Sequence, residues 1–114
     1  MLQIFHNPRC STSRKVLEKL QKANLEVEII EYMKNVPTVQ KLKVLLIKLN
    51  LKPQQIIRTG ETLYKQKFKG KNFSDEEWLH ILHENPVLIE RPIVVRKNKA
   101  IICRPPEKVE EFIC

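Results

Sequence analysis

A cysteine between an apolar strand and an amphipathic helix constrains this chain more than any other feature. The mostly apolar segment 2–5 precedes a polar loop, residues 6–10. After Cys10 the apolar residues recur at helical spacing, which predicts a helix over about residues 11–23. Pro8 disfavours helical backbone at the residue before it, so the helix does not begin earlier. Cys10 therefore lies where a strand passes into the first turn of a helix.

This position favours an acidic thiol at Cys10. The first turn of a helix has unpaired N–H groups and a partial positive charge, and both stabilise a thiolate. A cysteine at a helix N-terminus near cations has its pKa lowered from about 8.5 to about 3.5–7.5. His6, Arg9 and Arg14 are close to it in the sequence. The loop therefore predicts a thiolate nucleophile beside N–H groups that bind an oxyanion.

The order of the predicted elements indicates an α/β protein. Residues 27–30 form a second strand, and a strand–helix–strand unit of this length has parallel strands. Residues 92–96 and 99–103 predict a hairpin, and a last helix opens at Pro105 and Pro106. The result is a four-stranded mixed sheet whose reactive turn lies at the carboxyl end of the first strand.

The middle of the chain is predicted as a helical insertion over about residues 34–85. Thr38 begins a periodic amphipathic segment that continues to about residue 50. Ser74 and Glu77 have the spacing of a capping box before a second helix. We expect residues 1–114 to form a single domain, because neither part is large enough for an independent core.

The sequence of residues 6–14, His-Asn-Pro-Arg-Cys-Ser-Thr-Ser-Arg, closely resembles the active-site loop of the arsenate reductase family that works with glutathione and glutaredoxin. Three later segments match in order and spacing: residues 56–58, 89–95 and 103–105. The resemblance extends from about residue 2 to residue 112. It implies a thioredoxin-like fold with a helical insertion.

The resemblance also implies roles for individual residues. Cys10 is the catalytic nucleophile, and the oxyanion is bound by Arg58, Arg91 and Arg104, with Thr12 and Ser13 as further donors. Guanidinium groups suit this task because their planar fork matches an oxyanion. His6 and Arg14 are expected to stabilise the thiolate, although His6 has the alternative role of shaping the loop. Pro92 is expected to follow a cis peptide bond at the start of the third strand.

The expected substrate is arsenate, with glutathione as co-substrate, glutaredoxin as partner and no bound cofactor. No metal motif is evident, because His80 and His83 lack a third ligand. The three cysteines, Cys10, Cys103 and Cys114, fit a reducing, cytoplasmic compartment better than a disulfide scaffold. Ser13 occupies the place of the second cysteine in a Cys-x-x-Cys motif. A disulfide formed in turnover therefore needs Cys103, Cys114 or an external thiol, and we expect Cys103 to be buried.

Charge and hydropathy narrow the range of partners. The net charge is +8, but the lysines are scattered, which indicates a solvated basic surface rather than a nucleic-acid site. No apolar run reaches the roughly 20 residues that span a membrane.

Two alternative functions remain open. One is a regulator of the Spx type that binds RNA polymerase, although Ser13 removes the Cys-x-x-Cys switch typical of that branch. The other is a glutathione-dependent thiol reductase with a different substrate.

Overall fold

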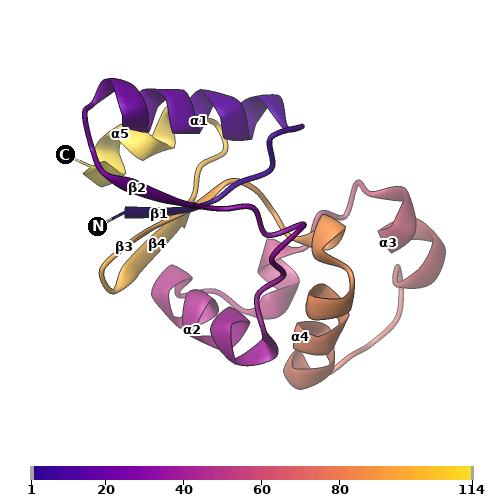
Figure 1. The fold of residues 1–114 in the computed structure, drawn as a ribbon. Coiled ribbons are helices and arrows are strands. Elements are labelled where there is room, and N and C mark those ends of the chain that lie inside the picture. Colours follow the sequence, from indigo (N-terminus) through magenta and orange to yellow (C-terminus); the bar gives the residue numbers. More distant parts are fainter. Residues whose placement is uncertain (1, 114) are drawn as a thin grey trace. The chain divides into compact units, whose positions relative to one another are not determined.

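The computed structural model describes residues 2–113, and the chain in it divides into two compact units (Figure 1). The first unit contains the two ends of the chain, up to Asn35 and from Arg91 onward. The second unit is the continuous segment Val36–Glu90. The predicted insertion, about residues 34–85, falls almost wholly within this second unit. Whether the chain behaves as one domain stays a prediction.

The first unit is built on a four-stranded sheet. Its strands are β1 (Leu2–Phe5), β2 (Val27–Ile30), β3 (Ile93–Arg96) and β4 (Lys99–Ile102). They are ordered β2-β1-β3-β4, with β1 and β2 parallel and the other two pairs antiparallel. The predicted α/β class and the mixed sheet are therefore confirmed.

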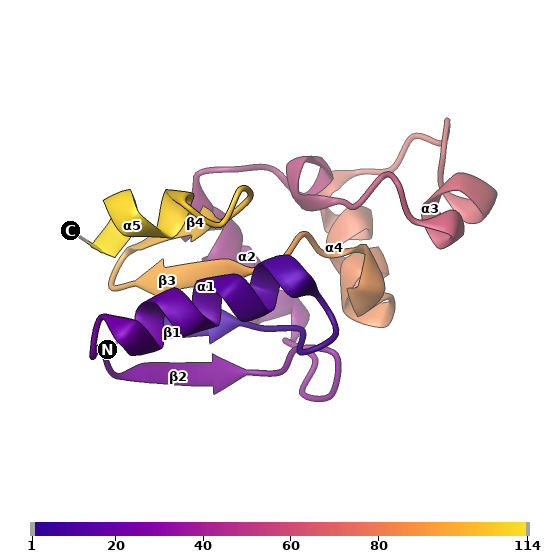
Figure 2. The same ribbon diagram turned by 90° about the horizontal axis from the view of Figure 1, so that it is seen from above.

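Helices α1 (Ser11–Lys22) and α5 (Lys108–Ile113) cover one face of this sheet (Figures 1 and 2). A single buried cluster joins the helices to the strands and contains Leu2, Ile4, Val16, Leu20, Val94, Cys103 and Val109. Helix α5 begins later than predicted. Lys108 N–H donates to Pro105 O and Val109 N–H donates to Pro106 O, which are i+3 turn bonds, so the two prolines form turns that precede the helix.

The second unit is helical. Its elements are α2 (Val39–Leu49), η1 (Pro53–Ile56), α3 (Thr62–Lys67), α4 (Asp75–Glu84) and η2 (Pro86–Leu88). Helix α4 packs against α2 and both 3₁₀ helices, and buries Trp78, Leu79 and Leu82. An isolated antiparallel bridge pairs Ile57 with Ile89.

The helix starts predicted in this unit are confirmed. The Thr38 hydroxyl accepts from Lys41 N–H at 3.1 Å. The Ser74 hydroxyl accepts from Glu77 N–H at 3.1 Å, while the Glu77 carboxylate accepts from Ser74 N–H at 2.9 Å. Such caps satisfy N–H groups that the helix leaves unpaired. Within residues 2–113, no helix has the length and apolar character needed to cross a membrane.

Candidate active site

Each of the four strands is followed or preceded by a candidate site residue at one edge of the sheet. In the parallel pair, Phe5 is aligned with Ile30, so the segments that follow β1 and β2 leave the sheet together. In the antiparallel pairs, Phe5 is aligned with Ile93 and Ile93 with Ile102. The start of β3 and the end of β4 therefore lie at that same edge. The residues brought there are Cys10, Tyr32, Arg91 and Arg104.

Local hydrogen bonds fix the loop that carries the cysteine. His6 N–H donates to Ile30 O at 2.8 Å, which ties the loop to the end of β2. Asn7 Oδ1 accepts from Arg9 N–H at 3.0 Å, and Asn7 O accepts from Cys10 N–H at 3.0 Å. Cys10 has an extended backbone, φ −94° and ψ 122°, and is the N-cap residue of α1. The thiol therefore lies at the mouth of the helix, as predicted.

The Cys10 thiol is half-buried and faces several donors. Burial raises its pKa, but this effect is outweighed by the Ser13 N–H, by the hydrogen bond and charge of Arg91, and by the Thr12 N–H. The net result is a pKa below the usual value for a thiol. Nη1 of Arg104 is 3.9 Å from the sulfur. The thiolate is thus favoured by helix N–H groups and a guanidinium, as expected for a reactive cysteine.

Arg104 and Arg91 are linked to each other as well as to Cys10. The Arg104 Nη1 group also donates to the main-chain oxygen of Arg91 at 3.1 Å. Arg91 is half-buried, Arg104 is exposed, and both lie beside the half-exposed sulfur. The Arg91–Pro92 peptide is cis, at the position implied by the resemblance. The Arg104–Pro105 peptide is also cis, which the sequence analysis did not predict.

This arrangement has close counterparts among known proteins. The model of the ArsC family matches residues 5–112. The chain belongs to the ArsC family.

Full-length relatives support this membership. The chain is 38% identical to the uncharacterised protein YfgD of Escherichia coli, over 98% of this chain and 96% of that protein. It is 35% identical to a protein of Neisseria meningitidis called arsenate reductase, over 98% of this chain and 97% of that protein. The solved structure of arsenate reductase from Vibrio cholerae has a TM-score of 0.92 and 39% identity, covering 96% of this chain and 95% of that one. The thioredoxin-like fold is therefore confirmed.

The structure shows the hydrogen-bond partners of two of the predicted loop residues, His6 and Ser13. His6 is buried, with Nδ1 2.6 Å from Ser13 Oγ. Burial lowers the pKa of His6, and although Glu31 opposes this effect, Arg14 adds to it. A lowered pKa disfavours the charged imidazolium that the thiolate-stabilising role requires. The contacts instead correspond to the alternative role of His6, shaping the loop.

Ser13 acts on Cys10 through its main chain. Its side chain is 0% exposed, and its hydroxyl accepts from Asn7 N–H at 3.1 Å while contacting His6. The Ser13 hydroxyl is thus hydrogen-bonded to other residues of the loop, and it is the Ser13 N–H that faces the sulfur of Cys10. Arg14 Nη1 donates to Pro8 O at 2.9 Å, so the Arg14 side chain braces the loop.

Arg58 belongs to the other unit, so its position at the site stays a prediction. Its N–H donates to Leu88 O at 2.7 Å beside the Ile57–Ile89 bridge. Its Nε is 3.8 Å from Glu61 Oε2. These contacts order the Arg58 backbone and give its side chain an acidic neighbour, which the sequence analysis did not identify.

The remaining candidates are two cysteines and two histidines. Cys103 is 0% exposed, and burial raises its pKa to about 12, as expected for an inert thiol. Cys114 lies outside the described residues. His80 is exposed, and His83 Nδ1 is 2.7 Å from Pro37 O. Between Leu2 and Ile113, no three histidine, cysteine or acidic residues are grouped in a way that could hold a metal ion.

Two residues at the site were missed by the sequence analysis. They are Asn7, whose side chain fixes the loop, and Tyr32, which follows β2 and is buried. The available signal for Tyr32 was its place just beyond the second strand of a parallel pair, where ligands usually bind.

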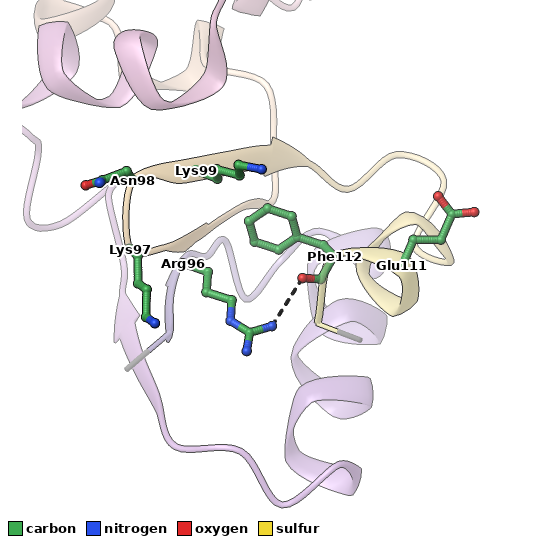
Figure 3. Close-up of a pocket in the computed structure, with 6 residues that line it drawn as sticks. All are labelled: Arg96, Lys97, Asn98, Lys99, Glu111 and Phe112. Carbon is green, nitrogen blue, oxygen red and sulfur yellow. Dashed lines mark hydrogen bonds between the residues drawn. The ribbon is translucent and has the colours of Figure 1, made fainter.

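A hollow of about 440 Å³ lies at the opposite end of the first unit (Figure 3). It is lined by Arg96, Lys97, Asn98, Lys99, Glu111 and Phe112. Because Arg96 is aligned with Leu2, at the start of β1, this hollow is at the far edge of the sheet from Cys10. It therefore forms no part of the thiolate site.

Proposed function

We propose that this protein is an arsenate reductase that uses the Cys10 thiolate as its nucleophile. The observation that carries the proposal is the half-exposed Cys10 sulfur, whose pKa is lowered by helix N–H groups and Arg91 and which lies 3.9 Å from Arg104 Nη1. Anions and thiolates are both stabilised by such groups. The relatives called arsenate reductases, at 35–39% identity, support arsenate as the oxyanion.

In this proposal the arginines neutralise the oxyanion next to the sulfur. Arg91 and Arg104 bind arsenate oxygens from the first unit, and Arg58 is the third member of the set. The N–H groups of Thr12 and Ser13 then face both the sulfur and the charge that develops on the substrate. His6 acts by holding Ser13, and Arg14 by holding the main chain of Pro8.

The reaction begins when the thiolate attacks arsenic. A sulfur–arsenic bond forms, the bond from arsenic to a hydroxyl oxygen breaks, and the departing hydroxide takes a proton from solvent to become water. The thiolate of glutathione then attacks the Cys10 sulfur. A disulfide bond forms, the sulfur–arsenic bond breaks, and its electron pair stays on arsenic, which is reduced from As(V) to As(III) and leaves as arsenite. Glutaredoxin restores Cys10 by thiol–disulfide exchange.

An external thiol is part of the proposal because of the other cysteines. Cys103 is buried, with a pKa raised to about 12 by burial, so it is a poor attacking group. Ser13 replaces the second thiol of a Cys-x-x-Cys motif. Among residues 2–113, this leaves no accessible second thiol to resolve an intermediate on Cys10.

The test is arsenate-dependent oxidation of NADPH in a mixture with glutathione, glutaredoxin and glutathione reductase. The wild-type protein should give turnover, Cys10→Ser should give none, and Cys103→Ser should retain it. The Neisseria meningitidis relative serves as positive control. Absence of wild-type turnover in a mixture where that control is active would contradict the proposal.

A further inference from the structure

Three of the arginines around Cys10 are engaged by other groups of the first unit. Arg14 Nη1 donates to a main-chain oxygen of the loop at 2.9 Å, and Arg104 Nη1 donates to Arg91 O at 3.1 Å. Arg91 is hydrogen-bonded to the Cys10 sulfur. Arg9 differs from them, because its side chain is exposed and its guanidinium forms no hydrogen bond or ion pair with the described residues. The loop therefore carries one cation that the fold does not use.

The main chain that carries Arg9 is held in place, although the side chain is in solvent. Arg9 N–H donates to Asn7 Oδ1 and Cys10 N–H donates to Asn7 O, both at 3.0 Å. Pro8 restricts the turn further, because its ring fixes one backbone angle. Successive Cα atoms are about 3.8 Å apart, so the long Arg9 side chain starts beside the residue that carries the sulfur. A molecule that attacks the Cys10 sulfur is therefore within reach of this guanidinium.

The reductant in the proposed reaction is an anion. Glutathione carries two carboxylates and one ammonium near neutral pH, so a net negative charge arrives together with its thiol. In the proposed reaction Arg91 and Arg104 are paired with arsenate oxygens when the thiol attacks. A carboxylate of the thiol therefore needs a further cation beside Cys10. A guanidinium suits this task, because its planar fork can hold both oxygens of a carboxylate.

We propose that Arg9 binds a carboxylate of the reducing thiol, and so makes glutathione a better reductant of Cys10 than a thiol without carboxylates. Arg9 is then a specificity-determining residue, which contacts the co-substrate and does not hold the oxyanion. The inference rests on the proposed function in one respect, that the thiol which attacks the intermediate on Cys10 comes from outside the chain. It does not depend on which oxyanion the site reduces.

The test measures thiol attack on a preformed disulfide and needs no arsenate. In a Cys114→Ser background, and with Cys103 buried, dipyridyl disulfide converts Cys10 to a mixed disulfide with a neutral pyridyl group. An added thiolate attacks the Cys10 sulfur, a new disulfide bond forms, and the bond to the pyridyl sulfur breaks, so that this sulfur leaves with its electron pair and takes up a proton as thiopyridone. The release rate per thiolate is compared for glutathione and its diethyl ester, which has the same thiol and no carboxylate.

The measured quantity is the ratio of the glutathione rate to the ester rate. This ratio should exceed one with Arg9 present and should fall about three- to fivefold in Arg9→Ala, as for loss of an exposed ion pair. Arg9→Lys should retain part of the preference, because the charge remains while the fork is lost. Lys15→Ala, the matched control, removes another exposed cation close in the sequence and should leave the ratio unchanged.

Three results would each overturn the inference. They are a ratio near one with Arg9 present, a ratio that Arg9→Ala leaves unchanged, and an equal fall of the ratio in Lys15→Ala, which would show that general positive charge attracts the thiol. A ratio that depends on Arg9 in a protein without arsenate turnover would support the inference and contradict only the proposed function.

Discussion

Cys10 and Cys103 lie at the same edge of one sheet, yet their thiols have opposite character. Cys10 follows β1, is half-buried and has a lowered pKa. Cys103 follows β4, is 0% exposed within the core cluster, and has its pKa raised to about 12 by burial. The reactivity of each thiol is therefore set by the hydrogen-bond donors and solvent around its sulfur. Its position at this edge of the sheet does not by itself make a cysteine reactive.

The arginine next to Cys103 illustrates the same point. Arg104 directly follows Cys103 in the sequence, but its Nη1 is 3.9 Å from the sulfur of Cys10. The main chain turns so that the cysteine faces the core and the arginine faces the edge. Arg104, which follows β4, thus places a positive charge beside Cys10. Cys103, the residue before Arg104, remains in an apolar surrounding.

The largest expected effect is the loss of turnover in Cys10→Ser. A serine hydroxyl in this place is not ionised near neutral pH, so no nucleophile remains. Cys103→Ser should retain turnover but lose stability, because it buries a hydroxyl in the core. The coupled assay measures the turnover of both variants, and thermal unfolding measures their stability. A Cys103→Ser protein that is folded but inactive would contradict the view that only Cys10 is the reactive thiol.

Arg91→Ala should have the next largest effect. It removes a hydrogen bond and a charge that lower the pKa of Cys10, and also a proposed oxyanion ligand. We expect kcat/KM for arsenate to fall about 100-fold, as for loss of one strong transition-state donor. The pH profile of Cys10 alkylation should move to higher pH.

Arg96→Ala is the matched control for that change. Arg96 is at the other end of β3 and exposed, with its guanidinium 3.5 Å from Phe112 O. Its loss should leave kcat/KM and the alkylation profile unchanged. Equal effects of the two substitutions would mean that general positive charge, rather than Arg91, sets the reactivity of Cys10.

Ser13→Ala should have a smaller effect, mainly on the fold. It leaves Asn7 N–H and His6 Nδ1 without their partner, which should cost about 1–3 kcal/mol of the free energy of unfolding. The Ser13 N–H remains in the chain, so a lowered Cys10 pKa should persist. Urea unfolding and the alkylation profile measure the two effects. A Cys10 pKa fully restored to that of a free thiol would show that the hydroxyl, not the main chain, holds the thiolate.

The smallest effect concerns the pH dependence of stability. In the unfolded chain Cys103 loses its proton near pH 8.5, as an ordinary thiol does. In the folded protein burial raises the pKa of this thiol to about 12. Between these values the unfolded state binds fewer protons, so this group makes stability fall as pH rises. Cys103→Ala should therefore lose less stability than wild type between pH 8 and pH 10, which urea unfolding at the two pH values measures. An equal loss of stability in the two proteins would contradict the burial of a protonated thiol.

Local patterns predicted most of the fold. The strand before Cys10, the parallel pair, and the caps at Thr38 and Ser74 each depend on neighbouring residues, which a sequence displays directly. The start of the last helix was predicted too early, because prolines suited to a first turn also suit a separate turn.

The site was only partly predictable. Cys10, Arg91 and Arg104 could be identified because the family motifs include them. Tyr32 reaches the site only through the register of β2 against β1, which the local sequence does not encode. Ser13 is predicted as a donor to the anion, but the sequence does not say which of its groups would donate. In the structure its side chain is buried against His6, and its N–H faces the sulfur.

The most direct measurement of the central claim is alkylation of the native wild-type protein with iodoacetamide across pH 5–10, with Cys10 and Cys103 quantified separately by mass spectrometry. Cys10 should react with a midpoint below that of a free thiol, near 8.5, and Cys103 should stay unmodified until the protein is unfolded in urea. A Cys10 midpoint at or above that of a free thiol, or Cys103 reacting as readily as Cys10 in the folded protein, would contradict the account.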